Sequence, residues 1–383
     1  MLAKHKRRTA LPWSHRKRVF AAVDLEEPDT VPITDLGMDP PVVEGLTGET
    51  THGFSIEGFS AGHIEVGEIC KKNMLAMARA YRKLGLDAVI VSDESIYRHG
   101  FVPRFLDENT FVDEWGRVMM TRSDTKTTWW VGGTIKTPED LENYEPPDAN
   151  APGRMEVFEA VIKEVGEDMV VAAGGHTGFS LAWRVRGGID KYIVDVYTNP
   201  SFAKKLMDKV VRACLEWDKA IMDTGVEMLA LTDDYSGTDG PFFSPKLFRE
   251  IEIPNLKSVV DEAKRKGVPV LKHTDGNNYP ILDDMVDTGI SGLHPMEPGA
   301  MDIAQVKQRY GDRIFLGGNV DCRWTLPYGS EEDVRTEVRR VIDAASPGGG
   351  HILMSSNTLH ANVKPQNVLT MIQEARKYGK YPR

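Results

Sequence analysis

Short apolar runs alternate with longer amphipathic segments along most of the chain. Each run ends in turn residues, and the segment after it has apolar positions near a 3.6-residue period, which predicts a helix. Apolar strands that alternate with helices are typical of a parallel sheet covered on both faces. Eight runs fit this pattern: 30–36, 87–94, 169–176, 227–235, 268–276, 290–298, 314–322 and 351–357. They predict an α/β fold, a (β/α)8 TIM barrel, with an open doubly wound sheet as the alternative.

Residues 100–135 interrupt the alternation. The stretches "FVPRF", "TFVDEWGRVMMTR" and "TKTTWWVGG" predict a small antiparallel β insertion after the second strand. Its tryptophans, Trp115, Trp129 and Trp130, have two interpretations: a lid over an aromatic substrate, or the core of the insertion itself. We expect one barrel domain over residues 1–383, in which residues 1–25 form a basic arm and the first helix.

The composition is that of an ordinary globular protein, with 41% hydrophobic and 27% charged residues in 383. A net charge of −10 argues against general binding of nucleic acid. No run approaches the roughly 18 apolar residues that a membrane span needs. The cysteines, Cys70, Cys214 and Cys322, lie far apart, which fits reduced thiols in the cytoplasm. We therefore expect a cytoplasmic protein, and the sequence leaves a homodimer open.

Polar residues follow nearly every predicted strand. In a barrel enzyme the carboxyl ends of the strands carry the catalytic groups. Because unpartnered ionisable groups are costly to bury, such a concentration favours a metal, a polar ligand or both. The residues are Asp35, Asp93, Glu94, His176, Asp233, Asp234, Tyr235, His273, Asp275, His294, Glu297, Asn319, Asp321, Cys322, Ser355, Ser356 and Asn357.

The stretch "PVLKHTDGNNYP" at 269–280 contains the clearest candidate metal ligands. His273 and Asp275 are two residues apart, so in a strand they share a face, and imidazole and carboxylate both suit zinc. A third ligand must come from another strand, and Glu94 and Cys322 are the candidates. In the alternative interpretation Asp275 caps a turn at Gly276 and accepts a hydrogen bond from His273.

Four stretches together resemble the uroporphyrinogen decarboxylase superfamily of (β/α)8 barrels from about residue 15 to the end. They are "GLDAVIVSDES", "SPKLFREIEIPNLKSVVDEAKRKGVPVLKHTDGN", "HPMEPGAMDIAQVKQRYGDRIFLGGNVD" and "ANVKPQNVLTMIQEARKYGKYP". True decarboxylases of this family carry an arginine-rich segment near the first strand, which binds the carboxylates of the porphyrin. Here that region reads "VPITDLGMDPPVVEG", without arginine.

A second branch of the superfamily consists of corrinoid-dependent methyltransferases, whose zinc ligands are a His-x-Cys pair and a later Cys. This chain keeps the histidine as His273, places Asp275 where the first Cys would be, and has Thr358 near the position of the later Cys. Oxygen-rich ligation suits a harder, more Lewis-acidic metal centre than thiolates do. The resemblance therefore implies an O-demethylase rather than a thiol methyltransferase.

The implied reaction moves a methyl group from a methoxylated small molecule, such as an aryl methyl ether, to the cob(I)alamin of a separate corrinoid protein. Zinc or an acid would assist the leaving oxygen. The expected catalytic residues are Asp93, Glu94 and Asp233. The expected substrate-binding residues are His176, Trp183, Tyr235, Asn319 and Asn357, and the expected metal ligands are His273 and Asp275 with Glu94 or Cys322. The alternatives are a metal-independent decarboxylase that relies on Asp93 and a non-catalytic corrinoid- or tetrapyrrole-binding protein.

Overall fold

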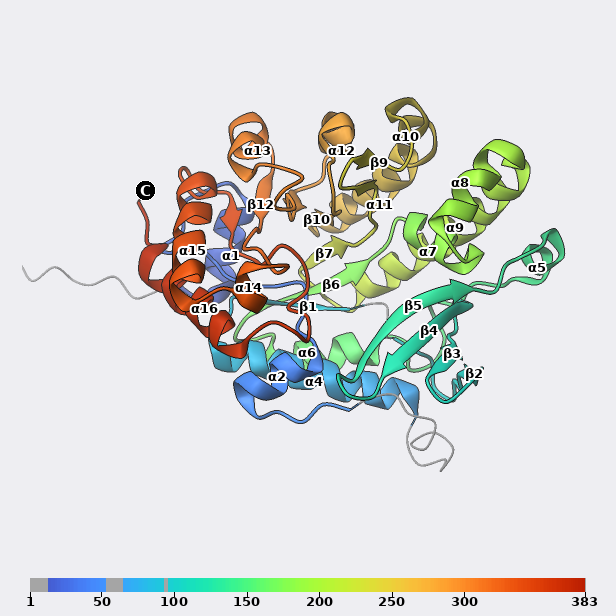
Figure 1. The fold of residues 1–383 in the computed structure, drawn as a ribbon, viewed down its shortest axis with the longest axis horizontal. Helices are drawn as coiled ribbons and strands as arrows, with labels where there is room; N and C mark the ends of the chain where they lie inside the picture. Colours follow the sequence, from blue (N-terminus) through green and yellow to red (C-terminus); the bar gives the residue numbers. More distant parts are fainter. Residues whose placement is uncertain (1–12, 53–64, 93–95, 383) are drawn as a thin grey trace, which may run out of the picture.

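A curled parallel sheet forms the centre of the molecule, and helices surround it (Figure 1). The structure is a computed structural model that describes residues 13–52, 65–92 and 96–382. Within these residues seven strands form the sheet in the order β1-β6-β7-β10-β11-β12-β13, each parallel to its neighbours. Their bounds are Ala88–Val91, Val170–Gly175, Met228–Leu231, Val270–His273, Gly292–His294, Phe315–Gly317 and His351–Ile352. The predicted α/β, TIM-like fold is confirmed.

Helices follow the strands along the chain, and several of their ends are set by local sequence. α15 begins with a reciprocal capping box, in which Ser330 and Asp333 accept hydrogen bonds from each other's backbone N–H. α11 ends at Gly267, whose φ of 71° favours glycine. The helices are α1 (His15–Val23), α2 (Pro40–Thr47), α4 (Val66–Leu84), α5 (Pro138–Asn143), α6 (Glu156–Val165), α7 (Phe179–Arg186), α8 (Ile189–Thr198), α9 (Pro200–Asp223), α10 (Pro245–Ile251), α11 (Ile253–Lys266), η1 (Tyr279–Ile281), α12 (Leu282–Asp287), α13 (Ile303–Tyr310), α14 (Thr325–Tyr328), α15 (Glu331–Ala345) and α16 (Pro365–Tyr378). In the part of the chain that the structure covers, no helix is long and apolar enough to cross a bilayer.

The prediction of a first strand over 30–36 is wrong, because this segment forms two isolated bridges, at Thr30 and at Ile33, instead of a strand. Ile33 pairs in parallel with Leu353, just beyond β13, and the Ile33 carbonyl accepts a hydrogen bond of 2.7 Å from Asp87 N, just before β1. Pro32 has no N–H to donate, and Ile33 N donates to the side chain of Asp87. These two losses interrupt the ladder, yet the segment still lies between β13 and β1 and joins them.

The β insertion is confirmed as an antiparallel sheet of four strands within the described residues. Trp115 packs against Trp217 of α9, with ring centroids 5.1 Å apart, and Trp130 meets Trp183 of α7 edge-on at 5.2 Å. These two tryptophans therefore fasten the insertion to neighbouring helices. The strands are β2 (Arg104–Phe105), β3 (Thr110–Val112), β4 (Arg117–Arg122) and β5 (Thr127–Gly133), and a separate hairpin is made by β8 (Ser236–Gly237) and β9 (Gly240–Pro241).

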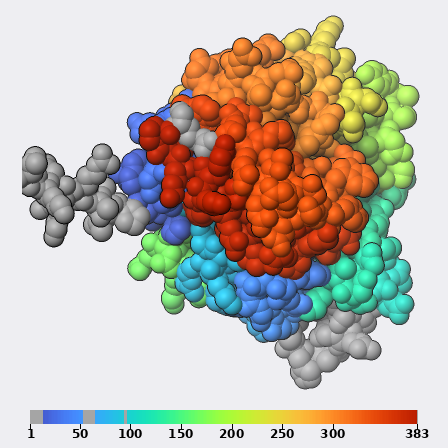
Figure 2. All heavy atoms as spheres, turned by 60° about the vertical axis from the view of Figure 1, so that its left-hand side comes forward, coloured from blue at the N-terminus to red at the C-terminus, as the bar shows by residue number. Residues whose placement is uncertain are grey.

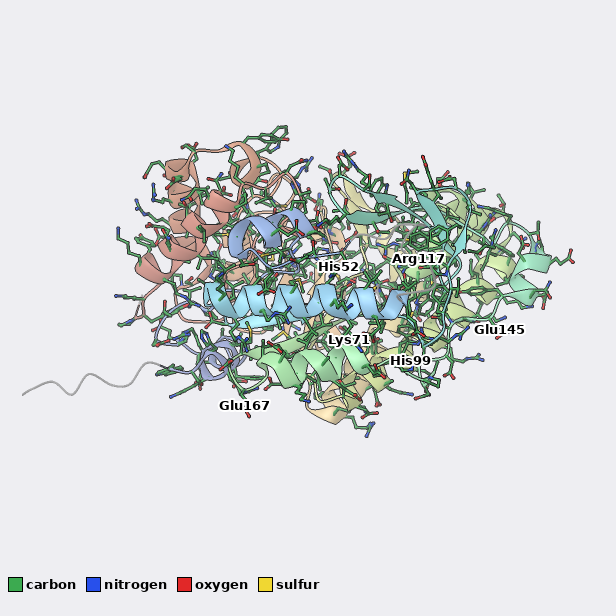
Figure 3. The ribbon with its side chains drawn as sticks, turned by 90° about the horizontal axis from the view of Figure 1, so that it is seen from below. His52, Lys71, His99, Arg117, Glu145 and Glu167 are labelled. Carbon is green, nitrogen blue, oxygen red and sulfur yellow. The ribbon has the colours of Figure 1, made fainter. Side chains whose placement is uncertain are left out.

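α4 and α6 run side by side on the face of the molecule seen in Figure 3. Lys71 on α4 and His99 in the segment after β1 both reach Glu156 on α6, at 3.1 Å and 3.0 Å. Because all three side chains are partly exposed, these pairs add little stability. The helices are held together mainly by their buried apolar faces.

A single buried carboxylate, that of Asp87, joins both ends of the described chain to the beginning of β1. It accepts hydrogen bonds of 2.7 Å each from His15 Nδ1 and Arg18 Nη1 on α1, Arg376 Nη2 on α16 and Ile33 N. Burial alone would raise the pKa of Asp87, but the His15 hydrogen bond and the two arginine charges hold it below its usual value. Figure 2 shows the N-terminal part of the chain in contact with the C-terminal part.

We expect Asp87→Asn to destabilise the protein by about 3–5 kcal/mol, because it leaves two arginines near a buried neutral group. The lowered pKa stabilises the fold above the unfolded value of about 3.9, and this contribution disappears as the pH falls through the folded pKa. Urea unfolding at several pH values should therefore show the variant converging on the wild type below about pH 4. Asp168→Asn removes only an exposed pair with Arg82 and should cost less than about 1 kcal/mol. A similar cost for both variants would contradict this account.

Candidate metal centre

The carboxyl ends of several strands border a cavity of about 440 Å³, a size that suits a small-molecule ligand. Part of its wall is apolar and comes from α2, α4, β1 and the loop before α2. Those residues are Met38, Pro40, Val43, Met74, Met77 and Ile90. Another part comes from Lys126 in the turn between β4 and β5 and from Thr127 and Thr128 at the beginning of β5. The polar part contains the residues described next.

Asp234, His273 and Asp275 converge on the cavity. Each offers one ligand atom, and these atoms all lie within 4.8 Å of one another. His273 Nε2 is 3.6 Å from Asp234 Oδ1 and 3.9 Å from Asp275 Oδ1. His273 is the last residue of β10, Asp275 follows two residues later, and Asp234 follows β7, the neighbouring strand. The structure thus brings the two sequence-predicted ligands together with a third residue.

The surroundings of Asp275 fit a bound cation. Its Oδ2 accepts a 2.6 Å hydrogen bond from Asn357 Nδ2, whereas its Oδ1 is buried and accepts none from the described residues. Burial, together with the charges of Asp234 and Glu297, raises the pKa of Asp275. A buried carboxylate oxygen without a donor, beside a second carboxylate, is costly unless a positive charge offsets it. One imidazole and two carboxylates suit zinc or a harder divalent ion.

His273 is held in the neutral form that binds metals. It is buried, and this burial lowers its pKa to about 4 despite the neighbouring Asp234. A neutral imidazole has one bare nitrogen, which can act as a ligand at neutral pH.

A buried lysine fixes the spacing between β7 and β10. Lys272 Nζ donates to the carbonyl oxygens of Asp233 at 2.6 Å and His273 at 2.7 Å, and lies 4.1 Å from the centre of the Tyr235 ring. These carbonyls belong to His273 itself and to the residue directly before Asp234. The ammonium group of Lys272 therefore fixes the backbone at both His273 and Asp234.

The sequence assigned a catalytic role to Asp233, and the structure places this carboxylate at the beginning of α7. It accepts hydrogen bonds from Thr177 N at 2.6 Å and Ser180 N at 2.7 Å. Burial alone would raise the pKa of Asp233, but His176, the charge of Lys272 and the hydrogen bond from Ser180 N together lower it. Asp93 and Glu94, the other predicted catalytic residues, lie outside the described residues.

Cys322, the alternative metal ligand, is not part of the three-residue cluster. Its sulfur accepts a hydrogen bond of 3.3 Å from Ser356 Oγ. Burial raises the pKa of the Cys322 thiol to about 11, so the thiol stays protonated at neutral pH.

The residues predicted to bind substrate are spread over different environments. Asn357 lines the cavity and orients Asp275. Tyr235 lies in the core, packed against Phe179 and Phe248.

Three further predicted residues do not line this cavity. Trp183 packs on Trp130 of the insertion. Asn319 Nδ2 donates a hydrogen bond of 2.6 Å to the carbonyl oxygen of Met296. His176 Nδ1 lies 3.7 Å from Asp233 Oδ2.

Asp234 is the ligand candidate to which the sequence gave no role. Neighbouring side chains in an extended chain point to opposite sides. The pair "DD" at 233–234 therefore predicts that one carboxylate faces the cavity and the other faces away, but not which one. In the structure Asp233 turns towards α7 and Asp234 towards the cavity. Spacing from β7 alone could not have told which one does so.

Together, the curled parallel sheet and the cluster at its carboxyl edge define a barrel-type protein with a candidate cation site beside a small-molecule cavity. A sequence model of the uroporphyrinogen decarboxylase (URO-D) family matches residues 124–378. The chain therefore belongs to this family.

Comparison with individual proteins agrees with this assignment. The uroporphyrinogen decarboxylase of Saccharophagus degradans is 26% identical over 251 residues, which cover 63% of this chain and 68% of that protein. The uroporphyrinogen decarboxylase of Thioalkalivibrio sulfidiphilus is 26% identical over 205 residues, which cover 51% of this chain and only 56% of the relative.

Two solved structures share the fold. A methyltransferase from Methanosarcina mazei aligns with a TM-score of 0.71 and 21% identity, over 96% of this chain and 99% of that chain. A B12-independent methionine synthase from Shewanella sp. W3-18-1 aligns with a TM-score of 0.50 and 12% identity, over 91% and 97% of the two chains. At these identities the likeness concerns the fold.

We expect the purified protein to bind one divalent cation, measured by elemental analysis and chelator competition. Asp234→Ala and Asp275→Ala should each weaken binding by more than the roughly 10- to 100-fold loss typical of an outer-shell partner. Asp39→Asn is the matched control, since Asp39 lines the same cavity outside the cluster, and it should leave the affinity unchanged. Equal affinity in all variants would rule out this site.

Proposed function

We propose that this protein is a corrinoid-dependent methyltransferase of the O-demethylase type. It moves a methyl group from a methoxylated small molecule, an aryl methyl ether, to the cob(I)alamin carried by a separate corrinoid protein. The observation that carries the proposal is the cluster of Asp234, His273 and Asp275 beside a cavity of about 440 Å³. Membership of the URO-D family and the fold shared with a methyltransferase support it.

The charge of the cavity wall favours this substrate over a porphyrin with many carboxylates. The wall formed by residues 36–43 includes Leu36, Met38 and Pro40, and that segment contains no arginine. Among the described lining residues the cations are Lys126 and Arg184, and Lys126 is paired with Glu44 at 2.6 Å. A substrate with many carboxylates would therefore find Arg184 as the one arginine among these lining residues, too few for bidentate pairing of each carboxylate.

The transfer breaks the bond between the methyl carbon and the ether oxygen, and the electron pair of that bond stays on the oxygen. The methyl carbon takes its new electron pair from the cob(I)alamin cobalt. A phenolate is a poor leaving group, and a divalent cation at the cluster would supply Lewis acidity towards that oxygen. Zinc is the cation we propose, and Asp93 is the proposed acid if a proton assists instead.

The chain's own residues prepare this reaction by binding and orientation. His273, Asp234 and Asp275 would hold the cation, and Asn357 fixes Asp275 through its hydrogen bond to Oδ2. The apolar wall around Met77 binds the aromatic ring and excludes water, which strengthens charge interactions inside the cavity.

A metal-independent decarboxylase is the second candidate function, and the named relatives favour it, since they are uroporphyrinogen decarboxylases. That reaction does not use the three-residue cluster. It predicts full activity after removal of the cation and in variants of His273 and Asp275.

The test is methyl transfer to free cob(I)alamin from a panel of methoxyarenes, followed by the change in cobalamin absorbance. We expect transfer by the wild type and a loss of about 100-fold or more in His273→Ala and Asp275→Ala. This corresponds to several kcal/mol of lost charge stabilisation at about 1.4 kcal/mol per tenfold.

Thermal unfolding of both variants should stay close to that of the wild type, which separates lost chemistry from lost folding. Wild-type rates of methyl transfer by the metal-stripped protein or by both variants would rule out this mechanism. Release of carbon dioxide from a porphyrinogen, without methyl transfer, would favour the second candidate.

A further inference from the structure

The ring of His273 belongs to a chain of hydrogen bonds that runs across neighbouring strands. His273 Nδ1 lies 2.8 Å from His294 Nδ1, and His294 Nε2 lies 2.9 Å from the carbonyl oxygen of Ser355. His273 and His294 are register partners at the ends of β10 and β11, so their side chains lie next to each other. All three residues are buried, and His294 and Ser355 are completely so.

The positions of the protons follow from these contacts. A carbonyl oxygen only accepts hydrogen bonds, so His294 Nε2 carries a hydrogen. The hydrogen-bond partners of the fully buried His294 are an imidazole and a carbonyl, and no carboxylate among the described residues pairs with it. A charge on this ring would be costly, so the ring is neutral and its Nδ1 is a bare acceptor.

The tautomer of His273 is then fixed as well. Two Nδ1 atoms 2.8 Å apart share one hydrogen, and it resides on His273 because His294 Nδ1 accepts. His273 Nε2 is therefore the bare nitrogen, and it is the atom that faces Asp234 and Asp275.

We propose that His294 is a positioning residue that selects the His273 tautomer with a bare Nε2 and holds that ring towards the two carboxylates. The inference rests on the metal centre of the proposed function. Without His294, the hydrogen of His273 can move to Nε2 and donate to Asp234 or Asp275. A hydrogen bond within the cluster would then occupy the nitrogen and the carboxylate oxygen that a cation needs as ligands.

The packing around His294 supports this role. A Cβ atom added to Gly317 on β12 would lie 3.4 Å from His294 Cδ2 and 2.9 Å from Met354 Sδ. The imidazole therefore lies close beside Gly317, where an added Cβ would reach van der Waals contact with the ring and crowd the Met354 sulfur. This contact restricts the ring from one side while the hydrogen bonds restrict its direction.

Three substitutions test the roles of the two ring nitrogens of His294 separately. His294→Asn keeps an acceptor near the position of Nδ1, His294→Gln keeps a donor near the position of Nε2, and His294→Phe removes both. Zinc affinity, measured by competition with a chelator, should fall about 10- to 100-fold in the Gln and Phe variants. It should stay close to the wild-type value in His294→Asn.

His351→Gln is the matched control. His351 on β13 is also completely buried and also bonds a carbonyl, that of Gly318, but it does not touch the cluster. Its substitution should leave zinc affinity unchanged. The Gln and Asn variants keep the test usable if His294→Phe does not fold.

Imidazole ¹⁵N chemical shifts of the metal-free protein give a second readout. The wild type should show hydrogen on His273 Nδ1, and His294→Gln should show a mixture of tautomers. The proposal is overturned if the wild type carries the hydrogen on His273 Nε2, if it binds no zinc, or if all variants bind zinc equally. Zinc affinity that depends on His294 without any methyl transfer would keep this inference and reject the proposed reaction.

Discussion

Closure of the parallel sheet is the constraint on which the rest of the molecule depends, and the buried carboxylate of Asp87 sits where the closure occurs. It binds groups from α1, α16 and the segment at Ile33, which are the beginning and the end of the described chain. Closure and curvature bring Asn357, beyond β13, to within 2.6 Å of Asp275, beyond β10. A flat sheet would hold these strands three positions apart, and the polar part of the cavity would not form.

The sequence predicted the sheet, the insertion and the pair His273 and Asp275, because hydrophobic period and strand-end position are local signals. It could not predict the interrupted first strand, since the side chain that captures Ile33 N belongs to Asp87, 54 residues later. It also could not decide between Asp233 and Asp234. Beyond the last ladder hydrogen bond of β7, the direction of a side chain depends on the path of the loop.

The cluster is supported by side chains that are not themselves ligand candidates. Lys272 bonds the backbone on which two of them lie, His294 contacts His273 from β11, and Asn357 bonds Asp275 from beyond β13. Each supporting group meets a different atom, so the three ligand atoms stay close together despite the repulsion between two carboxylates. The electrostatic cost of that repulsion is what makes the cluster receptive to a positive ion.

The β4–β5 hairpin of the insertion contributes a separate part of the cavity wall. Lys126, Thr127 and Thr128 line the cavity, although they belong to an insertion that adds no strand to the parallel sheet. The candidate cation ligands and some of the residues that line the rest of the cavity thus lie on different pieces of chain. Substitutions in this hairpin can therefore change which molecules the cavity admits without altering the three residues of the cluster.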